Sequence, residues 1–230
     1  MLIDFVVRNK DEDAAHVAKV LAESGVDLVV FDRDDEPLQK AIEVEGLHGL
    51  AAVALRDESA VLLAFGTEMP QQRIESVAQW NELNTAFAGV VAINHPYDRR
   101  SGRPWGDRVY RVKGLTHISA FLRDAEPARN QLASAAAQKL SAGSIYGSWA
   151  SVALRGKTAT FLNTDGPKTS AVVEAMLQQR TLGCHMQSIG EVYSPLSDPP
   201  RENTHEPRAR ASRSQDSERP RRSGRNDRRR

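Results

Sequence analysis

The chain has 230 residues, 40% of them hydrophobic, and a formal net charge of +1. This length and apolar content suffice for one α/β domain with a substantial core. No apolar run reaches the length of a membrane span, and the N-terminus lacks a basic and apolar signal segment, so we expect a soluble, cytoplasmic protein without a membrane partner. The single cysteine, Cys184, excludes an internal disulfide and a multi-cysteine zinc site.

The near-neutral net charge hides two segments of opposite character. Residues 201–230 contain 11 arginines and 5 acidic residues, a net charge of +6, whereas residues 1–200 carry −5. The basic segment has almost no apolar side chains, so it cannot bury enough surface to offset the entropy lost on ordering. We therefore predict a folded domain over residues 1–193 and a disordered Arg/Ser-rich tail over residues 194–230. The tail is a candidate arm for nucleic acid or an acidic protein, or alternatively a solubilising segment whose acids offset part of its charge.

Strands and helices alternate through the predicted domain. This alternation is typical of a mainly parallel α/β architecture, either a barrel or a doubly wound sheet. In one of the helices, the spacing of apolar residues points Leu132, Ala135, Ala136 and Leu140 inward. The predicted elements are strands at 1–7, 27–31, 50–55, 60–66, 90–93, 115–121, 141–144 and 158–162, and helices at 10–24, 36–44, 126–140, 169–179 and onward from Pro70.

One stretch, residues 90–100, ends a buried strand at His95, and Pro96 prevents the strand from continuing. A histidine at the carboxyl end of a strand occupies the position where α/β barrels build their active sites. A lone histidine of this kind more often packs or forms a hydrogen bond, so the stretch by itself favours a structural role. The sequence has no Gly-rich phosphate loop, nucleophile elbow or His-Glu-x-x-His motif.

The run Ala92-Ile93-Asn94-His95-Pro96-Tyr97 resembles the Ala-His-Pro-Phe segment of the polymerase and histidinol phosphatase (PHP) superfamily. Further similarities to this family follow the family's order and together cover about residues 2–190. The resemblance implies a distorted TIM-like (β/α)7 barrel of PHP type, whose relatives are metal-dependent phosphoesterases. The similar segments are Asp4-Phe5-Val6-Val7-Arg8 to Asp-Leu-His-x-His, residues 25–34 to Gly-Leu-Asp-x-x-x-x-Thr-Asp-His-Asp, residues 50–54 and 63–66 to Gly-Val-Glu and Leu-Leu-Ala-Phe-Gly, and residues 141–147 to the Gly-Ser-Asp-x-His turn.

The resemblance also implies that most of the family's metal ligands are missing. Valine, alanine, isoleucine and glycine offer no side-chain donor, and a guanidinium group repels a cation. We therefore expect no catalytic residue, no metal and no cofactor. The alternative is that the motifs are misaligned and that Asp4, Asp32, Asp34 and His95 form an unorthodox metal centre. At the family's ligand positions stand Val6, Arg8, Arg33, Ala54, Ile145 and Gly147, and only His95 matches.

The same alignment places Arg8 and Arg33 at adjacent strand ends in the barrel mouth, with His95 across from them. Buried guanidinium groups need partners, because an unpaired buried charge is costly. Two arrangements would supply these partners. Nearby acids can pair with the arginines in a closed ion-pair plug, which simple charge pairing favours, or a phosphate-type anion can bind between them. The predicted site at the mouth comprises Arg8, Arg33, His95, Asp4, Asp32, Asp34 and Asp98.

Three functions follow from these observations. The favoured one is a PHP-like protein that has lost phosphoesterase activity and acts as a binding or scaffold module. The second is a metal-dependent phosphoesterase with non-standard ligands. The third is an RNA-associated subunit similar to the metal-free barrel subunit of ribonuclease P, which rests on analogy of fold alone.

Overall fold

The computed structural model describes residues 1–57, 60–84, 87–99, 104–122, 125–149, 151, 154–185 and 194–195. These residues belong to a compact unit that spans Met1–Ser197. Except for residues 194–195, the predicted tail and its expected disorder lie outside the described residues. Within the described ranges, every helix is too short or too polar to cross a membrane.

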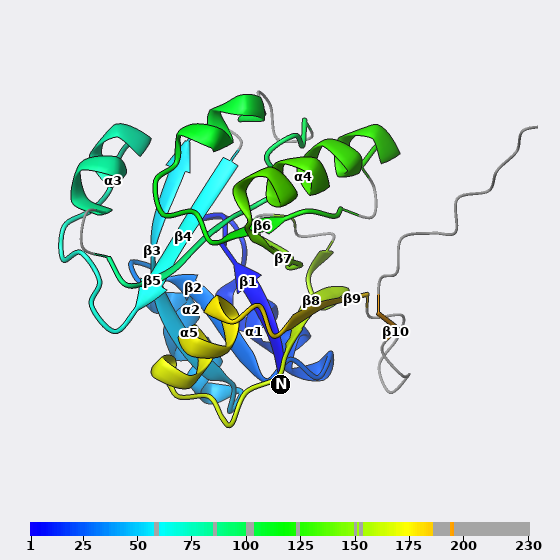
Figure 1. Ribbon diagram of the computed structural model, residues 1–230. Coiled ribbons are helices and arrows are strands. Elements are labelled where there is room, and N and C mark those ends of the chain that lie inside the picture. The colour runs from blue at the N-terminus through cyan, green and yellow to red at the C-terminus, as the bar shows by residue number, and fades with distance from the viewer. Residues whose placement is uncertain are drawn as a thin grey trace, which may run out of the picture. The chain divides into compact units, whose positions relative to one another are not determined.

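One mixed sheet organises the unit, and its strands follow the order β10-β9-β8-β1-β2-β3-β4-β5-β6-β7 (Figure 1). Neighbouring strands from β1 to β7 are parallel, except that β4 is antiparallel to both β3 and β5. The carboxyl ends of β1, β2, β3, β5, β6 and β7 therefore lie at the same rim. The strands are β1 (Leu2–Val6), β2 (Leu28–Asp32), β3 (His48–Asp57), β4 (Ala60–Gly66), β5 (Gly89–Ile93), β6 (His117–Ser119) and β7 (Gly143–Ile145).

The residues that follow β7 bring the sheet back to β1. The Trp149 N–H donates to the Phe5 carbonyl at 2.6 Å, and the Val7 N–H donates to the Trp149 carbonyl at 3.1 Å. These two bonds create a parallel bridge between Val6 and Trp149, and the Trp149 ring stacks on Phe5 with centroids 5.4 Å apart. The prediction of a barrel is confirmed, although its sheet is nearly closed and mixed rather than mainly parallel.

Three further strands continue the sheet from the edge of β1 that does not pair with β2. They are β8 (Thr158–Leu162), β9 (Thr181–His185) and β10 (Ser194–Pro195). Each is antiparallel to its neighbour. Only β8 was predicted, with the bounds that the structure has. The predicted boundary between domain and tail falls immediately before β10.

The helix α2 (Glu36–Val44) has its predicted bounds, and η2 (Gly106–Arg111) is an unpredicted 3-10 helix. The helix α5 (Thr169–Leu177) ends two residues earlier than predicted, and α1 (Ala14–Glu23) begins four residues later, after Asp13, whose side chain accepts from the Ala15 N–H. The helix predicted from Pro70 is wrong in its start, because α3 (Val77–Leu83) begins after Ser76, whose hydroxyl accepts from the Gln79 N–H. The carbonyls of residues 70–72 instead accept hydrogen bonds from the Arg33 guanidinium, so they are not available to a first helical turn.

The helix α4 (Pro127–Leu140) has its predicted position but a different buried face. Ala133, Ala136 and Ala137 are buried, whereas Leu132 is 51% exposed and Ala135 is exposed too. Alanines on several sides of this helix weaken the apolar periodicity, and packing against the barrel selects the face. The prediction for Leu132 and Ala135 is therefore wrong, while Leu140 packs partly buried against the core.

The core has an inner and an outer layer. Alternate strand residues, among them Ile3 and Phe5 of β1, face the barrel interior together with Val172 and Met176 of α5. The opposite faces of the same strands pack outward in two further clusters. One lies between β1, β2, α1 and α2, and the other involves β3 to β6, α3, η2 and α4.

Candidate functional site

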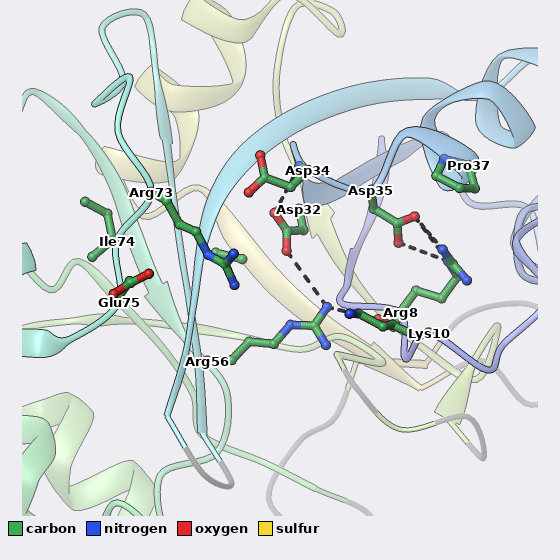
Figure 2. Close-up of a pocket in the computed structure, with 11 residues that line it drawn as sticks. Arg8, Lys10, Asp32, Asp34, Asp35, Pro37, Arg56, Arg73, Ile74 and Glu75 are labelled. Carbon is green, nitrogen blue, oxygen red and sulfur yellow. Dashed lines mark hydrogen bonds and ion pairs between the residues drawn. The ribbon is translucent and has the colours of Figure 1, made fainter.

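A pocket of about 560 Å³ opens at the barrel mouth, beside the carboxyl ends of β1, β2 and β3 (Figure 2). Its walls come from the loop after β1, the turn between β2 and α2, the end of β3 and residues 73–75 before α3. Eight of its eleven lining residues carry ionisable side chains. Four are basic (Arg8, Lys10, Arg56 and Arg73) and four are acidic (Asp32, Asp34, Asp35 and Glu75).

Arg8 is held by Asp35 in a bidentate ion pair. The Arg8 Nε donates to Asp35 Oδ2 at 3.0 Å, and Nη2 donates to Oδ1 at 2.7 Å. The Arg8 Nη1 also donates to the Glu12 carbonyl at 2.5 Å. Hydrogen bonding to Asp35 raises the pKa of the Arg8 guanidinium above its ordinary value. Arg8 therefore forms part of the pocket wall as a neutralised pair.

Arg33 points away from the pocket and holds the loop that precedes α3. Its Nη1 donates to the Pro70 carbonyl, and Nη2 donates to the carbonyls of Gln71 at 2.8 Å and Gln72 at 3.0 Å. Its Nε lies 3.8 Å from Asp34 Oδ1, whose side chain is 63% exposed. The contact of Arg33 with the pocket is indirect, because the loop that it holds continues into Arg73.

Asp32 and Arg56 face each other across the ends of β2 and β3 (Figure 2). Asp32 Oδ1 accepts from the Asp34 N–H at 3.1 Å, and Asp32 Oδ2 lies 3.9 Å from Arg56 Nη2. The same Arg56 nitrogen donates to the Arg8 carbonyl at 2.9 Å. Burial raises the pKa of the Asp32 carboxyl above its ordinary value, which means that the weak contact with Arg56 does not fully compensate its desolvation.

His95 and Asp98 lie at the end of β5, away from this pocket. His95 is buried, and its Nε2 is 3.0 Å from Oδ1 of Asn130 in α4. The same Asn130 side chain exchanges two hydrogen bonds with the backbone of Leu122. The Asp98 N–H donates to the His95 carbonyl at 3.2 Å. These contacts give His95 a structural role in joining β5 to α4.

Asp4 is fully buried where the barrel closes. Its carboxylate accepts from the Ser148 N–H at 2.6 Å and from the Ser148 hydroxyl at 2.7 Å. Arg155, itself paired with Glu12, donates to the Ser148 hydroxyl at 2.7 Å. Burial raises the pKa of Asp4 to about 6, even though the bonds from Ser148 and the charge of Arg155 lower it.

Of the seven predicted site residues, the pocket therefore brings together Arg8, Asp32 and Asp34. Arg33, His95, Asp4 and Asp98 lie elsewhere. Sequence reasoning missed Asp35, although it stands at the N-cap of α2, where its side chain accepts from the Leu38 N–H. It also missed Lys10, Arg56, Arg73 and Glu75. Arg56 directly follows a predicted strand and could have been found in that way.

No protein-family model and no curated protein sequence matches the chain. Solved structures do. A two-domain protein from Bacteroides vulgatus, containing a predicted PHP-like metal-dependent phosphoesterase, superposes with a TM-score of 0.56 at 12% identity, over 80% of this chain. The fold is PHP-like. The chain spans 64% of the length of that protein. Two further structures superpose less well. PsfC from Pseudomonas syringae has a TM-score of 0.49 at 12% identity, over 79% of this chain and 90% of PsfC. A proposed metal-dependent phosphoesterase from Bifidobacterium adolescentis has a TM-score of 0.48 at 14% identity, over 77% of this chain and 96% of that protein.

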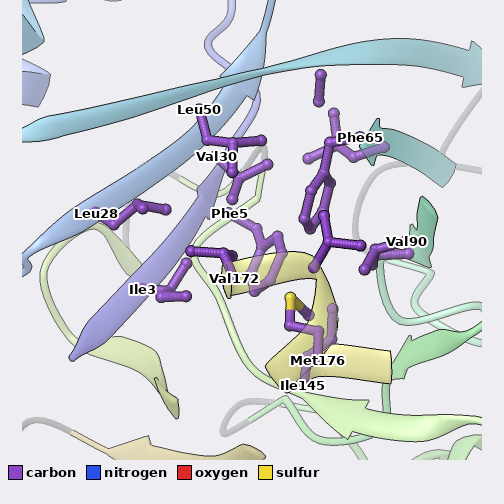
Figure 3. Packing of buried hydrophobic residues seen from close by; sticks show 14 of the residues in the cluster. Ile3, Phe5, Leu28, Val30, Leu50, Phe65, Val90, Ile145, Val172 and Met176 are labelled. Atoms are coloured by element: carbon purple, nitrogen blue, oxygen red, sulfur yellow. The ribbon is translucent and has the colours of Figure 1, made fainter. Parts of the chain in front are cut away.

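The residues at the mouth of this PHP-like barrel do not fit a metal centre. In the described part of the chain, no group of three or more His, Cys, Asp or Glu side chains is placed to hold a metal ion. Val6 packs outward between β1 and the first two helices, and the interior is filled by apolar side chains such as Phe5, Phe65 and Ile145 (Figure 3). The alternative ligands are also separated, because Asp4 binds Ser148, His95 binds Asn130, and only Asp32 and Asp34 share the pocket.

Proposed function

We propose that this chain is a PHP-like binding module that does not hydrolyse phosphate esters through bound metal ions. The observation that carries the proposal is the chemistry of the mouth, where arginines engage acids and backbone carbonyls beside the pocket. A metal-dependent phosphoesterase needs several neutral or anionic donors that converge on each cation. Guanidinium groups in their place oppose cation binding, because they stay protonated.

The position of His95 supports the same conclusion. It is the one residue that matches a ligand position of the family, yet its Nε2 is engaged by Asn130 of α4. In the described part of the chain, His95 also belongs to no group of three or more His, Cys, Asp or Glu residues that could complete a metal site. The pocket lies instead at the ends of β1, β2 and β3, and most of its lining residues are charged. Such a pocket is suited to bind a polar small molecule.

Metal content and turnover test this proposal. The purified protein is incubated with Mn²⁺ or Zn²⁺, freed of unbound metal and subjected to elemental analysis, and hydrolysis of p-nitrophenyl phosphate and bis(p-nitrophenyl) phosphate is followed. We expect substoichiometric metal and no metal-dependent turnover. The matched variant is His95→Ala. One or more tightly held ions per chain, together with turnover that His95→Ala abolishes, would overturn the proposal.

A further inference from the structure

We infer that the mouth pocket binds a small phosphorylated compound that also carries hydroxyl groups, and that Arg56 and Arg73 hold its phosphate. The inference rests on the proposed function, because it assigns a ligand to the binding module. The inference depends on the positive charges of basic side chains in the pocket, which are not metal ligands. The argument begins with the charges that the pocket leaves unpaired.

Two basic side chains in the lining have no partner for their charge. Among the described residues, neither the Arg73 guanidinium nor the Lys10 ammonium forms a hydrogen bond or ion pair, and both residues are exposed. Arg56 is only weakly neutralised, because its nearest carboxylate oxygen, on Asp32, is 3.9 Å away. Three basic side chains from separate segments therefore line one pocket and have N–H donors that no acceptor in the described part of the chain uses. An anion that accepts bidentate hydrogen bonds from guanidinium groups satisfies them best.

Figure 2 shows how the two arginines reach this space. Arg56 extends from the end of β3 and Arg73 from the loop before α3, and both side chains point toward the space beside Asp32. Arg33 fixes the start of that loop through three carbonyls, so Arg73 is held beside the pocket. Arg8 contributes less, because Asp35 already satisfies it. The ligand contacts are therefore assigned to Arg56 and Arg73, with Arg33 as a positioning residue.

The acids in the lining determine the second half of the ligand. Once the Arg8–Asp35 pair is set aside, Asp32, Asp34 and Glu75 balance Lys10, Arg56 and Arg73 in charge. A lining that is neutral overall disfavours a bare polyanion. It suits a ligand with one anionic group and several hydroxyls that donate to carboxylates. The volume of about 560 Å³ is within the range of pockets that hold small organic molecules, so a pentose phosphate fits.

The test uses three probes on the full chain: ribose 5-phosphate, inorganic phosphate and ribose. Calorimetric titration gives the dissociation constants, and thermal unfolding gives the stabilisation that each probe confers. We expect ribose 5-phosphate to bind most tightly, phosphate to bind weakly, and ribose to have no measurable effect. Raising the salt concentration should weaken the first two, since the contacts are charge-assisted.

The decisive variants are Arg73→Ala and Arg56→Ala, both at exposed positions, and thermal unfolding without ligand shows whether each variant is folded. Each should weaken ribose 5-phosphate binding roughly 10- to 100-fold, which corresponds to the loss of a hydrogen bond to a charged group. The matched control is Arg180→Ala, an exposed arginine between α5 and β9, at the opposite rim of the barrel. It should bind like the unaltered chain, and Arg73→Lys should bind with intermediate affinity.

Two outcomes would overturn the inference. One is the absence of any binding or stabilisation by ribose 5-phosphate at low salt. The other is equal binding by Arg73→Ala, Arg56→Ala and Arg180→Ala, which would place the phosphate elsewhere. Neither outcome affects the proposed function, which is judged by metal content and turnover. Hydrolysis of ribose 5-phosphate in the presence of a metal would contradict the proposed function even if binding were found.

Discussion

Asp35 binds Arg8 and caps helix α2 with the same carboxylate. Its Oδ1 accepts from Arg8 Nη2 at 2.7 Å and from the Leu38 N–H at 3.3 Å, while Oδ2 accepts from Arg8 Nε at 3.0 Å. The two charged side chains are only 12% and 9% exposed. The pair thus joins the loop after β1 to the start of α2 and fixes one wall of the mouth pocket. It resembles the ion-pair plug expected from the sequence, with an acid that was not among those expected.

Removing this carboxylate should destabilise the fold. Asp35→Ala loses both the cap and the charged partner of a largely buried arginine, and we expect a loss of roughly 2–4 kcal/mol in the free energy of unfolding. Asp35→Asn keeps a capping oxygen and should lose about 1 kcal/mol less. Urea denaturation of both variants gives these values. Equal losses in the two variants would show that the cap contributes nothing.

Arg33 should control the loop before α3 without being needed for the barrel. In Arg33→Ala, the carbonyls of residues 70–72 lose their donors, so the amides of residues 71–76 should exchange hydrogen faster. Arg33→Lys should restore little, because an ammonium cannot reproduce the planar fork that reaches three carbonyls. Hydrogen exchange measured by mass spectrometry tests this, and the strands β1 to β3 serve as the internal reference. Unchanged exchange over residues 71–76 would contradict this role of Arg33.

The fold was more predictable from the sequence than the site. Alternating elements and ordered motifs indicated the barrel, because the strand interiors are buried apolar runs such as Val90–Val91–Ala92. The helix from Pro70 failed, because a tertiary contact from Arg33 overrides a favourable local start. Within the site, Arg8 and Asp32 were found as strand-end residues. Lys10 and Arg73 lie in loops, where no periodicity indicates which way a side chain points.

The stability of the protein should depend on the neutral form of His117. Its side chain is buried beside Gly143 and Met176, and burial lowers the pKa of His117 to about 4 from an ordinary value of 6.5. Protonation therefore favours the unfolded chain. The stabilisation that comes from keeping His117 neutral is fully present above pH 6.5. It is lost as the pH falls towards 4, which lowers the free energy of unfolding by roughly 3 kcal/mol in total. In His117→Gln, the free energy of unfolding should decline less than in the unaltered chain between these pH values. Parallel pH profiles for the two proteins would contradict this.

Asp4 should act in the opposite direction over nearly the same range. Because its pKa in the folded chain is raised to about 6, above the ordinary 3.8, its contribution is complete below 3.8 and is lost as the pH rises through 6. Asp4 thus masks part of the loss caused by His117. Asp4→Asn should make stability decline more steeply on acidification from pH 6 to 4, as measured by urea denaturation at fixed pH values. A shallower decline in this variant would mean that Asp4 stays ionised in the folded protein.

The Arg-rich segment 198–230 should be dispensable for the fold and active in electrostatic binding. A chain that ends at residue 197 should keep its thermal midpoint nearly unchanged, because the deleted residues include almost no apolar side chains.

The full chain should bind single-stranded RNA in fluorescence anisotropy at low salt, and the truncated chain should not. Each arginine that contacts a phosphate releases a counterion, so the slope of log affinity against log salt reports their number. Replacing Arg219, Arg221 and Arg222 with glutamine in the full chain should reduce that slope by roughly two, at about 0.7 for each single-strand contact. Equally poor binding by full and truncated chains would leave the segment with a solubilising role, and a large fall in the thermal midpoint after truncation would show that it packs on the barrel.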